Sequence, residues 1–427
     1  MRKLNIAIIG LGNIGSYLYK YLRDNKKILT EKNNCLPIVK YVSAKNKKRK
    51  RSFIIKKNQW LNNYLDATKY KDVDLIVELI GGAEGAAKKL VFNALKNKKH
   101  VVTANKALIA KYGDILSKIA EKNKVNLEFE ASVCGGVPII RSLKEGLIAN
   151  KISKIYGIFN GTSNYILSSM EKEKKNFADV LKRAKNLGYA ESNPSADLNG
   201  EDVASKLKIL SSLCFNSFLN DKIYVEGINQ IDKIDINNAN SLGYKIKLLG
   251  FAELYNNRIY QRVHPTLIKK DSYVASIDGV LNAVIVDGRP VGKSIIQGEG
   301  AGPAATTSAL ISDISSILRG NIKFPFSLSN KERKLLKFEN INERFFSAYF
   351  RFEVMDRSGV LSNITNVFSK NRVSIKRLIQ NPDKNKKNSS IIIITHSSKD
   401  KNLNKILKEI SKRKYIKRKP KLIRIEN

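Results

Sequence analysis

The sequence predicts an α/β protein whose first unit is a doubly wound parallel sheet and whose later units mix helices and strands. Apolar runs alternate with segments of helical spacing over residues 1–130, which favours a parallel sheet. Longer helical segments precede a series of strand-like runs over residues 131–320. A polar segment, residues 321–345, then leads to a last alternating unit, residues 346–427. Since 427 residues exceed one ordinary core, we expect these units to be separate domains joined by a linker.

In the first unit, strands are expected where short apolar runs end at polar or glycine residues. These runs are residues 4–9, 36–42, 73–80, 101–103 and 125–129. Helical spacing lies between them, at residues 14–22, 86–95 and 108–121. The run VDLIVELI is nearly all apolar, as expected for a strand that is buried on both faces of a sheet.

The second unit is expected to be an α+β domain. Its predicted helices are residues 139–148, 163–174, 177–187, 201–215 and 304–318. Its predicted strands are residues 247–254, 258–268, 274–277 and 283–286. Because helices and strands are segregated along this unit, it is not expected to continue the parallel sheet.

The third unit begins after the polar linker, which contains Pro325 and shows little periodicity. Strands are expected at residues 348–354, 373–379 and 390–395, with a loop over residues 381–388. Helices are expected at residues 360–370 and 403–412.

The formal net charge of +40 raises the possibility of a nucleic-acid partner. The lysines are spread over the whole chain, however, so solvated surface is the better interpretation, and such a field attracts anionic small molecules. No apolar run reaches the length of a membrane span. Cys35, Cys134 and Cys214 show no disulfide or metal-ligand spacing, which fits a reducing compartment. We therefore expect a cytoplasmic protein without a nucleic-acid or membrane partner.

The motif GLGNIG places Gly10, Gly12 and Gly15 between a predicted strand and a predicted helix. The first glycine permits a tight turn, the second lets the backbone approach a pyrophosphate, and the third allows close packing of helix on strand. The helix begins at Asn13 and Ile14, whose N–H groups can hold the anion. The motif predicts a dinucleotide-binding Rossmann domain; the alternative is a glycine-rich turn without a ligand.

Cofactor preference is set by the end of the second strand, where an acidic residue would hold the ribose hydroxyl of NAD. The sequence there is KYVSAKNKKRKR, without an acid. Ser43, Lys45 and Lys48 can instead meet a 2′-phosphate, so NADP is favoured over NAD. The alternative is that these lysines belong to the general charge excess.

Two polar segments follow predicted strands of the first unit. Thr103 and Lys106 lie at a strand end, where doubly wound sheets carry ligands, although a surface lysine is a simpler interpretation. Glu130 precedes Gly135 and its neighbour in a glycine turn, and such a segment can bind a hard cation through oxygens. Cys134 lies there too, but no histidine is near it in sequence to activate the thiol.

The segment LGYAESNPSADLNGEDVASK concentrates acidic residues before a helix. Asp202 and Lys206 are four residues apart on that helix and therefore share a face. A partly desolvated lysine beside a carboxylate is a plausible proton donor. From spacing alone, an ordinary helical salt bridge is the better interpretation of the pair.

Seven segments together resemble the homoserine dehydrogenase family over about residues 3–320. They are GLGNIG, VELIGG, HVVTANKALIA, FEASVCGGVPII, GIFNGTSNYIL, LGYAESNPSADLNGEDVASK and GEGAGPAATTSA, in that order. The resemblance implies NAD(P)H-dependent interconversion of aspartate semialdehyde and homoserine, with Lys206 as the general acid and base and Asp202 as its partner. It also implies a homodimer or homotetramer, with the second unit as catalytic and dimerisation domain.

The resemblance further implies which residues bind ligands. Substrate contacts are expected at Gly188, Glu191, Asp197 and Lys106. The cofactor cleft is bordered by the NGTSN turn and by the GEGAG loop, which ends at Gly302. A sodium-like or potassium-like ion is expected on oxygens of Glu130, Val133, Gly135 and Val137.

The segment FRFEVMDRSGVLSNITNVFSKNRVSIKRLIQ resembles an ACT domain, a βαββαβ module that binds small ligands. The turn DRSGVL, residues 356–361, leaves free N–H groups that can take an amino-acid carboxylate. Ser358 stands where a proline is often found. Threonine is the effector that the family resemblance suggests, and the alternative is a domain that serves only to oligomerise.

Overall fold

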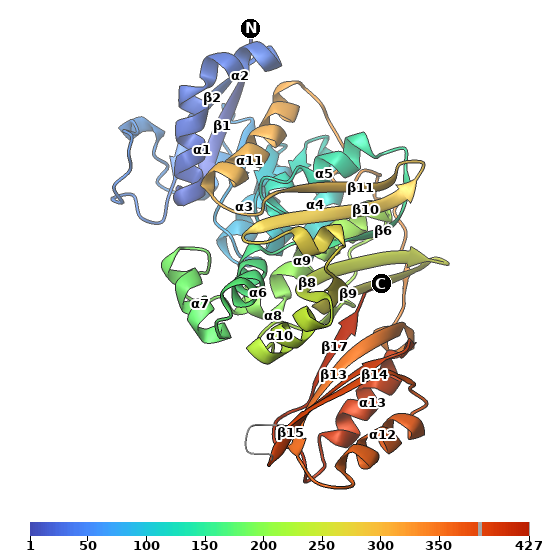
Figure 1. Ribbon diagram of the computed structural model, residues 1–427. Helices are drawn as coiled ribbons and strands as arrows, with labels where there is room; N and C mark the ends of the chain where they lie inside the picture. Colours follow the sequence, from blue (N-terminus) through green and yellow to red (C-terminus); the bar gives the residue numbers. More distant parts are fainter. Residues whose placement is uncertain (383–386, 427) are drawn as a thin grey trace.

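The computed structural model describes residues 1–382 and 387–426. Its three units follow one another along the molecule, with the N-terminal sheet at the top of Figure 1, a central sheet in the middle and the C-terminal unit below it. Among the described residues, every helix is too short or too polar to cross a lipid bilayer.

The first unit is a five-stranded parallel sheet with the strand order β2-β1-β3-β4-β5. Its strands are β1 (Arg2–Ile9), β2 (Cys35–Ser43), β3 (Leu75–Glu78), β4 (His100–Thr103) and β5 (Leu127–Glu128). Its main helices are α1 (Asn13–Asp24), α3 (Ala86–Lys96) and α4 (Lys106–Asn123). This confirms the predicted doubly wound sheet. The short helix α2 (Lys26–Asn33) was not predicted, because its polar sequence buries only three residues.

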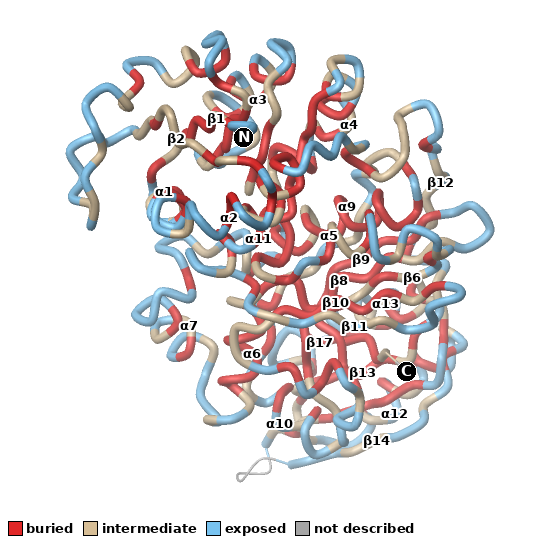
Figure 2. The backbone as a smooth tube through the Cα atoms, turned by 90° about the horizontal axis from the view of Figure 1, so that it is seen from above, coloured by how far each residue is buried: buried red, intermediate tan, exposed pale blue. Residues whose placement is uncertain are grey.

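The second unit packs helices on an antiparallel sheet with the order β11-β10-β6-β8-β9. Its strands are β6 (Lys151–Ile158), β8 (Tyr244–Tyr255), β9 (Arg258–Lys269), β10 (Leu281–Arg289) and β11 (Gly292–Glu299). Its helices include α6 (Gly161–Glu173), α7 (Phe177–Asn186), α8 (Ser195–Asn199), α9 (Glu201–Cys214) and α10 (Lys233–Ser241). Strands β8 and β10 and helix α9 run through the buried region in Figure 2.

Two expectations for the second unit were wrong in detail. The strand expected at residues 274–277 is a 3₁₀ turn, η5 (Tyr273–Ser276), since the run is too short to extend beyond one turn. The single helix expected at residues 139–148 divides into α5 (Ile139–Arg141) and a π turn, η4 (Ser142–Gly146). Strands β6 and β11 were missed because lysine, serine and glycine interrupt their apolar residues.

The third unit has the βαββαβ order expected from its resemblance to an ACT domain. It comprises β13 (Phe345–Met355), α12 (Val360–Lys370), β14 (Ile375–Pro382), β15 (Asn388–Thr395), α13 (Asp400–Ile410) and β17 (Lys421–Ile425). Phe350, Phe352 and Phe368 form the centre of its core, with two of the rings edge to face at 5.1 Å. The loop expected at residues 381–388 includes residues 383–386, which lie outside the described part.

The sheets of the second and third units are continuous, which the sequence did not predict. Strand β17 pairs with β13 on one side and, in parallel, with β9 on the other. Arg424 and Ile425 face Thr266 and Leu267 across this join. The C-terminal strand therefore extends the central sheet, as Figure 1 shows below the label of β9.

Segments at the boundaries of the units pack across them. Helix α11 (Pro303–Leu318) follows the central sheet in sequence but packs on α1 of the first unit. Within the polar segment 321–345, Phe326 is fully buried, 5.3 Å from the ring of Phe129. Arg333 donates to the carbonyl of Ser217 at 2.7 Å. The segment therefore runs as a strap held against both preceding units.

Candidate active site

The centre of the candidate site is the lysine and aspartate that share one face of α9. Lys206 Nζ lies 2.7 Å from Asp202 Oδ2 and donates to the carbonyl of Phe159 at 2.7 Å. Both side chains are more than nine-tenths buried. The buried position distinguishes this pair from an ordinary helical salt bridge on a solvated surface.

A second lysine reaches the same carboxylate from the first unit. Lys106, at the start of α4, places Nζ 2.6 Å from Asp202 Oδ1, and its side chain is 43% exposed. Asp202 therefore lies between two ammonium groups that come from different units. Burial alone would raise the pKa of Asp202, but the two lysine charges outweigh burial and hold the pKa below its usual range.

Asn160 connects the acidic residues of the site. It precedes α6 and caps it, since Asn160 Oδ1 accepts the N–H of Ser163 at 2.7 Å. Its amide nitrogen donates to Asp197 Oδ1 at 2.7 Å and to Asp202 Oδ2 at 2.8 Å. Burial and the charge of Asp202 raise the pKa of Asp197. The sequence placed Asn160 only at the border of the cofactor cleft, so its bridging position was missed.

The electrostatics of the site favour a charged lysine. Burial would lower the pKa of Lys206, but the charge of Asp202 outweighs burial and the pKa is raised. Lys206 is therefore an ammonium group at neutral pH, held in a site with little solvent. Burial also raises the pKa of Cys134 to about 11, so this neighbouring thiol stays protonated.

Not all of the expected substrate contacts are assembled. Asp197 lies in the cluster, whereas Gly188 and Glu191 are exposed on the loop before α8. Within the described parts of the chain, no ion pair joins Glu191 to the lysines of the site.

The glycine motif forms one wall of a cavity of about 610 Å³ at the ends of β1, β2 and β3. Gly10 has φ +112°, and a Cβ atom there would lie 2.4 Å from the carbonyl oxygen of Leu79. A Cβ atom on Gly15 would lie 2.1 Å from the carbonyl oxygen of Gly10. Both positions therefore require glycine. Gly12 lines the cavity at the start of α1 with nothing near its missing Cβ, which leaves space for a ligand.

Basic side chains also line this cavity. Lys45 lines it, as does Ser43, whereas Lys48 is not among its lining residues. Arg49 and Arg51 line it as well and were missed by sequence reasoning. Arg49 Nη2 donates to Asn13 Oδ1 at 2.7 Å, so this guanidinium reaches the first residue of α1. The run KNKKRKR was the available signal, but it did not indicate which side chains turn inwards.

Thr103 and Gly302 lie outside the lining of that cavity. Thr103 Oγ1 donates to Glu78 Oε2 at 2.5 Å, and Glu78 Oε1 accepts the N–H of Ile80 at 2.7 Å. Thr103 therefore fixes the loop after β3, which carries part of the cavity wall. Gly302, with φ +112°, directly precedes α11.

The predicted cation segment is buried and rich in oxygen atoms. The carboxylate of Glu130 accepts the N–H groups of Ile140 and Arg141 at 2.8 and 2.6 Å. Burial raises its pKa to about 7. The N–H of Gly136 donates to the carbonyl of Glu299 at 2.9 Å, which ties the segment to the GEGAG loop. Among the described residues, no three His, Cys, Asp or Glu side chains cluster as metal ligands, so a cation here would depend on backbone carbonyls such as those of Val133, Gly135 and Val137.

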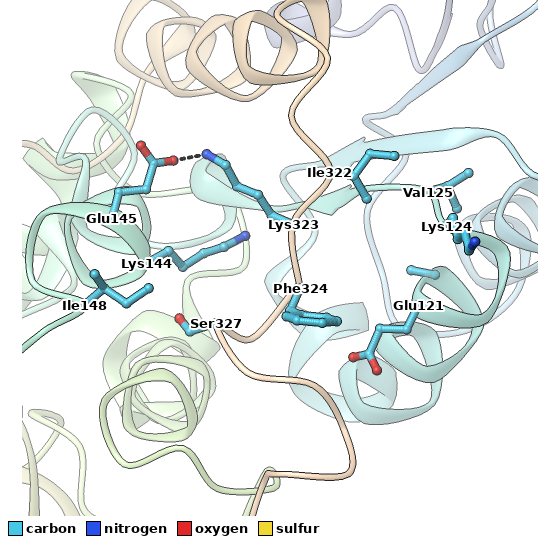
Figure 3. Close-up of a pocket in the computed structure, with 11 residues that line it drawn as sticks. Glu121, Lys124, Val125, Lys144, Glu145, Ile148, Ile322, Lys323, Phe324 and Ser327 are labelled. Atoms are coloured by element: carbon cyan, nitrogen blue, oxygen red, sulfur yellow. Dashed lines mark hydrogen bonds and ion pairs between the residues drawn. The ribbon is translucent and has the colours of Figure 1, made fainter.

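A cavity of about 550 Å³ lies elsewhere, between the end of α4, the turn after η4 and the strap (Figure 3). Glu145 and Lys323 form an ion pair across it. Lys144 lines it but pairs with the buried Glu128 at 2.9 Å. This cavity contains none of the groups around Asp202, and we do not place the chemistry there.

Comparisons with known proteins agree with this arrangement. The family model described as "Homoserine dehydrogenase, NAD binding domain" matches residues 10–130. The model described as "Homoserine dehydrogenase" matches residues 138–315. The model of the ACT domain matches residues 348–414. The first unit therefore binds a nicotinamide dinucleotide, and the third unit is an ACT domain.

Full-length relatives and solved structures carry the same name. Homoserine dehydrogenase of Neisseria gonorrhoeae is 37% identical over 438 residues, covering 100% of this chain and 99% of that protein. The Helicobacter pylori protein of that name is 37% identical over 428 residues, with 100% of both covered. A crystal structure of a homoserine dehydrogenase from Thiobacillus denitrificans superposes with a TM-score of 0.92 at 36% identity, covering 100% of this chain and 99% of that one. The chain belongs to the homoserine dehydrogenase family.

Proposed function

We propose that the protein catalyses the reversible, NAD(P)H-dependent reduction of L-aspartate 4-semialdehyde to L-homoserine. The observation that carries this proposal is the buried Asp202 carboxylate, which lies between Lys206 of the second unit and Lys106 of the first. Lys106 follows β4 of the sheet whose first turn carries the glycine motif, so the cluster faces the unit that binds the dinucleotide.

Aldehyde reduction requires a group that protonates or stabilises the oxygen as it gains charge. Lys206 is an ammonium group in a site that excludes most water, so it donates the proton in reduction and accepts it in oxidation. Asp202 holds the ammonium in place through their 2.7 Å contact. A bound nicotinamide supplies the hydride.

The acidic residues near this pair suit the charged end of the substrate. Asp197 is half-buried beside Asn160 and offers a carboxylate to the substrate ammonium. Glu191, with Gly188 on the same loop, is proposed to meet that ammonium from the solvent side. Lys106 is proposed to contact both substrate and cofactor, because its side chain is the exposed member of the cluster.

The basic rim of the 610 Å³ cavity supports NADP as the preferred cofactor. Lys45 and Arg49 supply charge there, and β2 ends without an acid that would select the hydroxyl of NAD. A monovalent cation, Na⁺ or K⁺, is proposed on Glu130 and the carbonyls of Val133, Gly135 and Val137. The buried carboxylate and the link to Glu299 support this position, where a cation would order the segment beside the GEGAG loop.

The ACT domain is proposed to bind threonine and to inhibit the enzyme. In the turn at residues 356–361, Gly359 has a φ of +82° and directly precedes α12. The first N–H groups of a helix have no partner within the helix, so they can take a carboxylate. The active unit is proposed to be a homodimer or homotetramer.

The proposed chemistry is tested by Lys206→Ala, with Lys208→Ala as the matched control. Both lysines are buried on α9, but Lys208 pairs with Asp221 outside the cluster. Loss of the general acid should cut turnover by at least about 100-fold. NADPH affinity, measured by fluorescence titration, should change little. Near-normal turnover of Lys206→Ala, or an equal loss in the control, would refute the assignment.

A further inference from the structure

A buried asparagine, Asn282, lies beside the pair formed by Lys206 and Asp202. It is the second residue of β10, and its side chain is fully buried. Its amide nitrogen donates to the carbonyl of Phe159 at 3.1 Å. Lys206 donates to the same carbonyl at 2.7 Å. One backbone oxygen, directly after β6, therefore accepts from both Asn282 and the proposed general acid.

The amide of Asn282 is held in one orientation. Gly300 of the GEGAG loop packs against it, and a Cβ atom on Gly300 would overlap all three heavy atoms of the amide group. Burial raises the pKa of the nearby Cys134 thiol, while the charge of Lys206 and a hydrogen bond with Asn282 oppose that rise. The reverse orientation would bring the amide oxygen against the carbonyl oxygen of Phe159, and two acceptors repel each other. The amide nitrogen therefore faces Phe159.

The shared carbonyl limits the directions that the Lys206 ammonium can take. A carbonyl oxygen has two lone pairs, so a donor on one of them leaves the other for a second donor. Lys206 Nζ has three N–H bonds. The carbonyl of Phe159 takes one of them, and Asp202 Oδ2, at 2.7 Å, takes another. Counted over the described residues, one N–H is thus left for an oxygen of the substrate.

We propose that Asn282 is a positioning residue of the reaction and that it acts through Lys206. By occupying one lone pair of the Phe159 carbonyl, Asn282 restricts the ammonium to the other lone pair and so directs its remaining N–H. Because Asn282 is fully buried, it does not itself contact the substrate. This inference rests on the proposed function, since it takes Lys206 as the general acid. The alternative is that Asn282 only joins β10 to the backbone after β6.

Steady-state kinetics of homoserine oxidation by the full chain test this role in a double-mutant cycle between Asn282 and Lys206. Asn282→Ala should lower kcat by about tenfold, because the ammonium loses its fixed direction. The KM for homoserine and the dissociation constant of NADPH should change by no more than about twofold. In the Lys206→Ala background, Asn282→Ala should lower kcat by less than about twofold, because the group that Asn282 directs is already absent.

Two further variants separate positioning from stability. Asn126→Ala is the matched control, because Asn126 is also fully buried and its amide donates to a backbone carbonyl, that of Asn321, at 2.6 Å. It should lower the melting temperature and leave kcat unchanged. Asn282→Asp keeps the size of the side chain but, as a carboxylate, cannot donate to the Phe159 carbonyl. It should therefore lower kcat at least as much as Asn282→Ala does.

The positioning role is overturned if Asn282→Ala keeps the parental kcat, if its loss lies mainly in KM or in NADPH binding, or if the full loss recurs in the Lys206→Ala background. It is also overturned if neither Asn282 variant folds, since Asn282 would then be required for the fold itself. Each of these results leaves the proposed function intact. Parental turnover in Lys206→Ala alone would instead count against the proposed function.

Discussion

The Asp202 carboxylate forms ion pairs with two lysines from different units of the chain. The candidate site therefore depends on this residue. Lys106 lies 2.6 Å from one oxygen and Lys206 lies 2.7 Å from the other. The carboxylate raises the pKa of Lys206 against the effect of burial. This has a consequence for the pH dependence of the reaction.

In the proposed mechanism, homoserine oxidation requires Lys206 as a neutral amine, and that form increases as pH rises toward the raised pKa. Asp202→Asn removes the charge that raises the pKa, so the rising limb of the pH profile should move to lower pH. The maximal rate should also fall, because the ammonium loses its ion pair. The measurement is kcat/KM for homoserine from neutral to alkaline pH. The control is Asp221→Asn, which removes the partner of Lys208 and should leave the pH profile unchanged. A pH profile that does not shift in Asp202→Asn would contradict the proposed role of the Asp202–Lys206 pair.

Arg49 should set cofactor preference. It lines the cavity beside the glycine motif and already contacts Asn13. Arg49→Ala should weaken NADP binding by about tenfold and NAD binding little, because a charge-assisted bond to phosphate is lost. Lys48→Ala, from the same basic run but outside the cavity lining, is the control. If Arg49→Ala lowered the affinities for NADP and NAD equally, a contact between Arg49 and the 2′-phosphate of NADP would be excluded.

Sequence reasoning found the residues of the site that interact locally. Helical spacing was enough to pair Asp202 with Lys206. It could not show that Asn160 bridges two carboxylates, because that geometry depends on how α6 packs beside α9. It also could not choose Arg49 over Lys48, since neighbouring residues of an irregular loop point in directions that periodicity does not define.

At the scale of elements, an ionic link leads from β17 to the helix that carries Asp197. Arg424 and Lys421 each lie 3.3 Å from the carboxylate of Glu226. Two residues further on, the N–H of Ile228 donates to the carbonyl of Leu198 in α8 at 2.8 Å. These contacts connect the ACT domain to the helix that carries Asp197 through one short segment.

Glu226→Gln should weaken the coupling between threonine binding at the ACT domain and turnover, without changing turnover in the absence of threonine. The threonine concentration that gives half-maximal inhibition should rise several-fold, because an ion pair linking the two units becomes weaker. Initial rates of homoserine oxidation at increasing threonine concentration measure this. Glu173→Gln, which breaks an ion pair with Arg183 away from the join, should respond like the parent chain. An unchanged inhibition curve in Glu226→Gln would argue against this route.

The strands that carry the first sheet were predictable, and the pairing of β17 with β9 was not. Apolar runs identify buried strands such as β3 directly. In contrast, β6 contains the exposed Lys151 and Ser153 among its buried isoleucines, and these polar positions obscured its strand pattern. The β9–β17 pair depends on the relative orientation of two units, which no local pattern in either strand encodes.

At the scale of the whole molecule, the ACT domain covers one part of the outer edge of the central sheet. Strand β9 buries Thr266 opposite Arg424 of β17, and the short strands β7 (Tyr224–Val225) and β12 (Lys337–Phe338) cover other parts of β9. Helix α11 and the strap similarly tie the first unit to the second. The sequence pattern predicts the order of the three units, but these contacts between units form only in the folded chain.

A chain ending at Asn342 should therefore be less stable than the full chain, beyond the loss of the ACT domain itself. Removal of β17 leaves the buried Thr266 of β9 without its cover, and the edge that is exposed there costs free energy. The melting temperature of the remaining units should fall by on the order of 5–10 °C. Differential scanning calorimetry at matched protein concentration measures this melting temperature. The control is Tyr415→Phe, which alters only the core of the ACT domain and should leave the melting temperature of the other units unchanged. A truncated chain that melts with the parent would show that β9 does not depend on β17.

The join between β9 and β17 also bears on biosynthesis. On a translating ribosome, β9 emerges long before residues 421–425 exist, with a delay on the order of ten seconds at ordinary elongation rates. During that interval its edge is open to pairing with other nascent chains. Slower elongation, or a shortage of chaperones that shield such edges, should thus lower the yield of native protein.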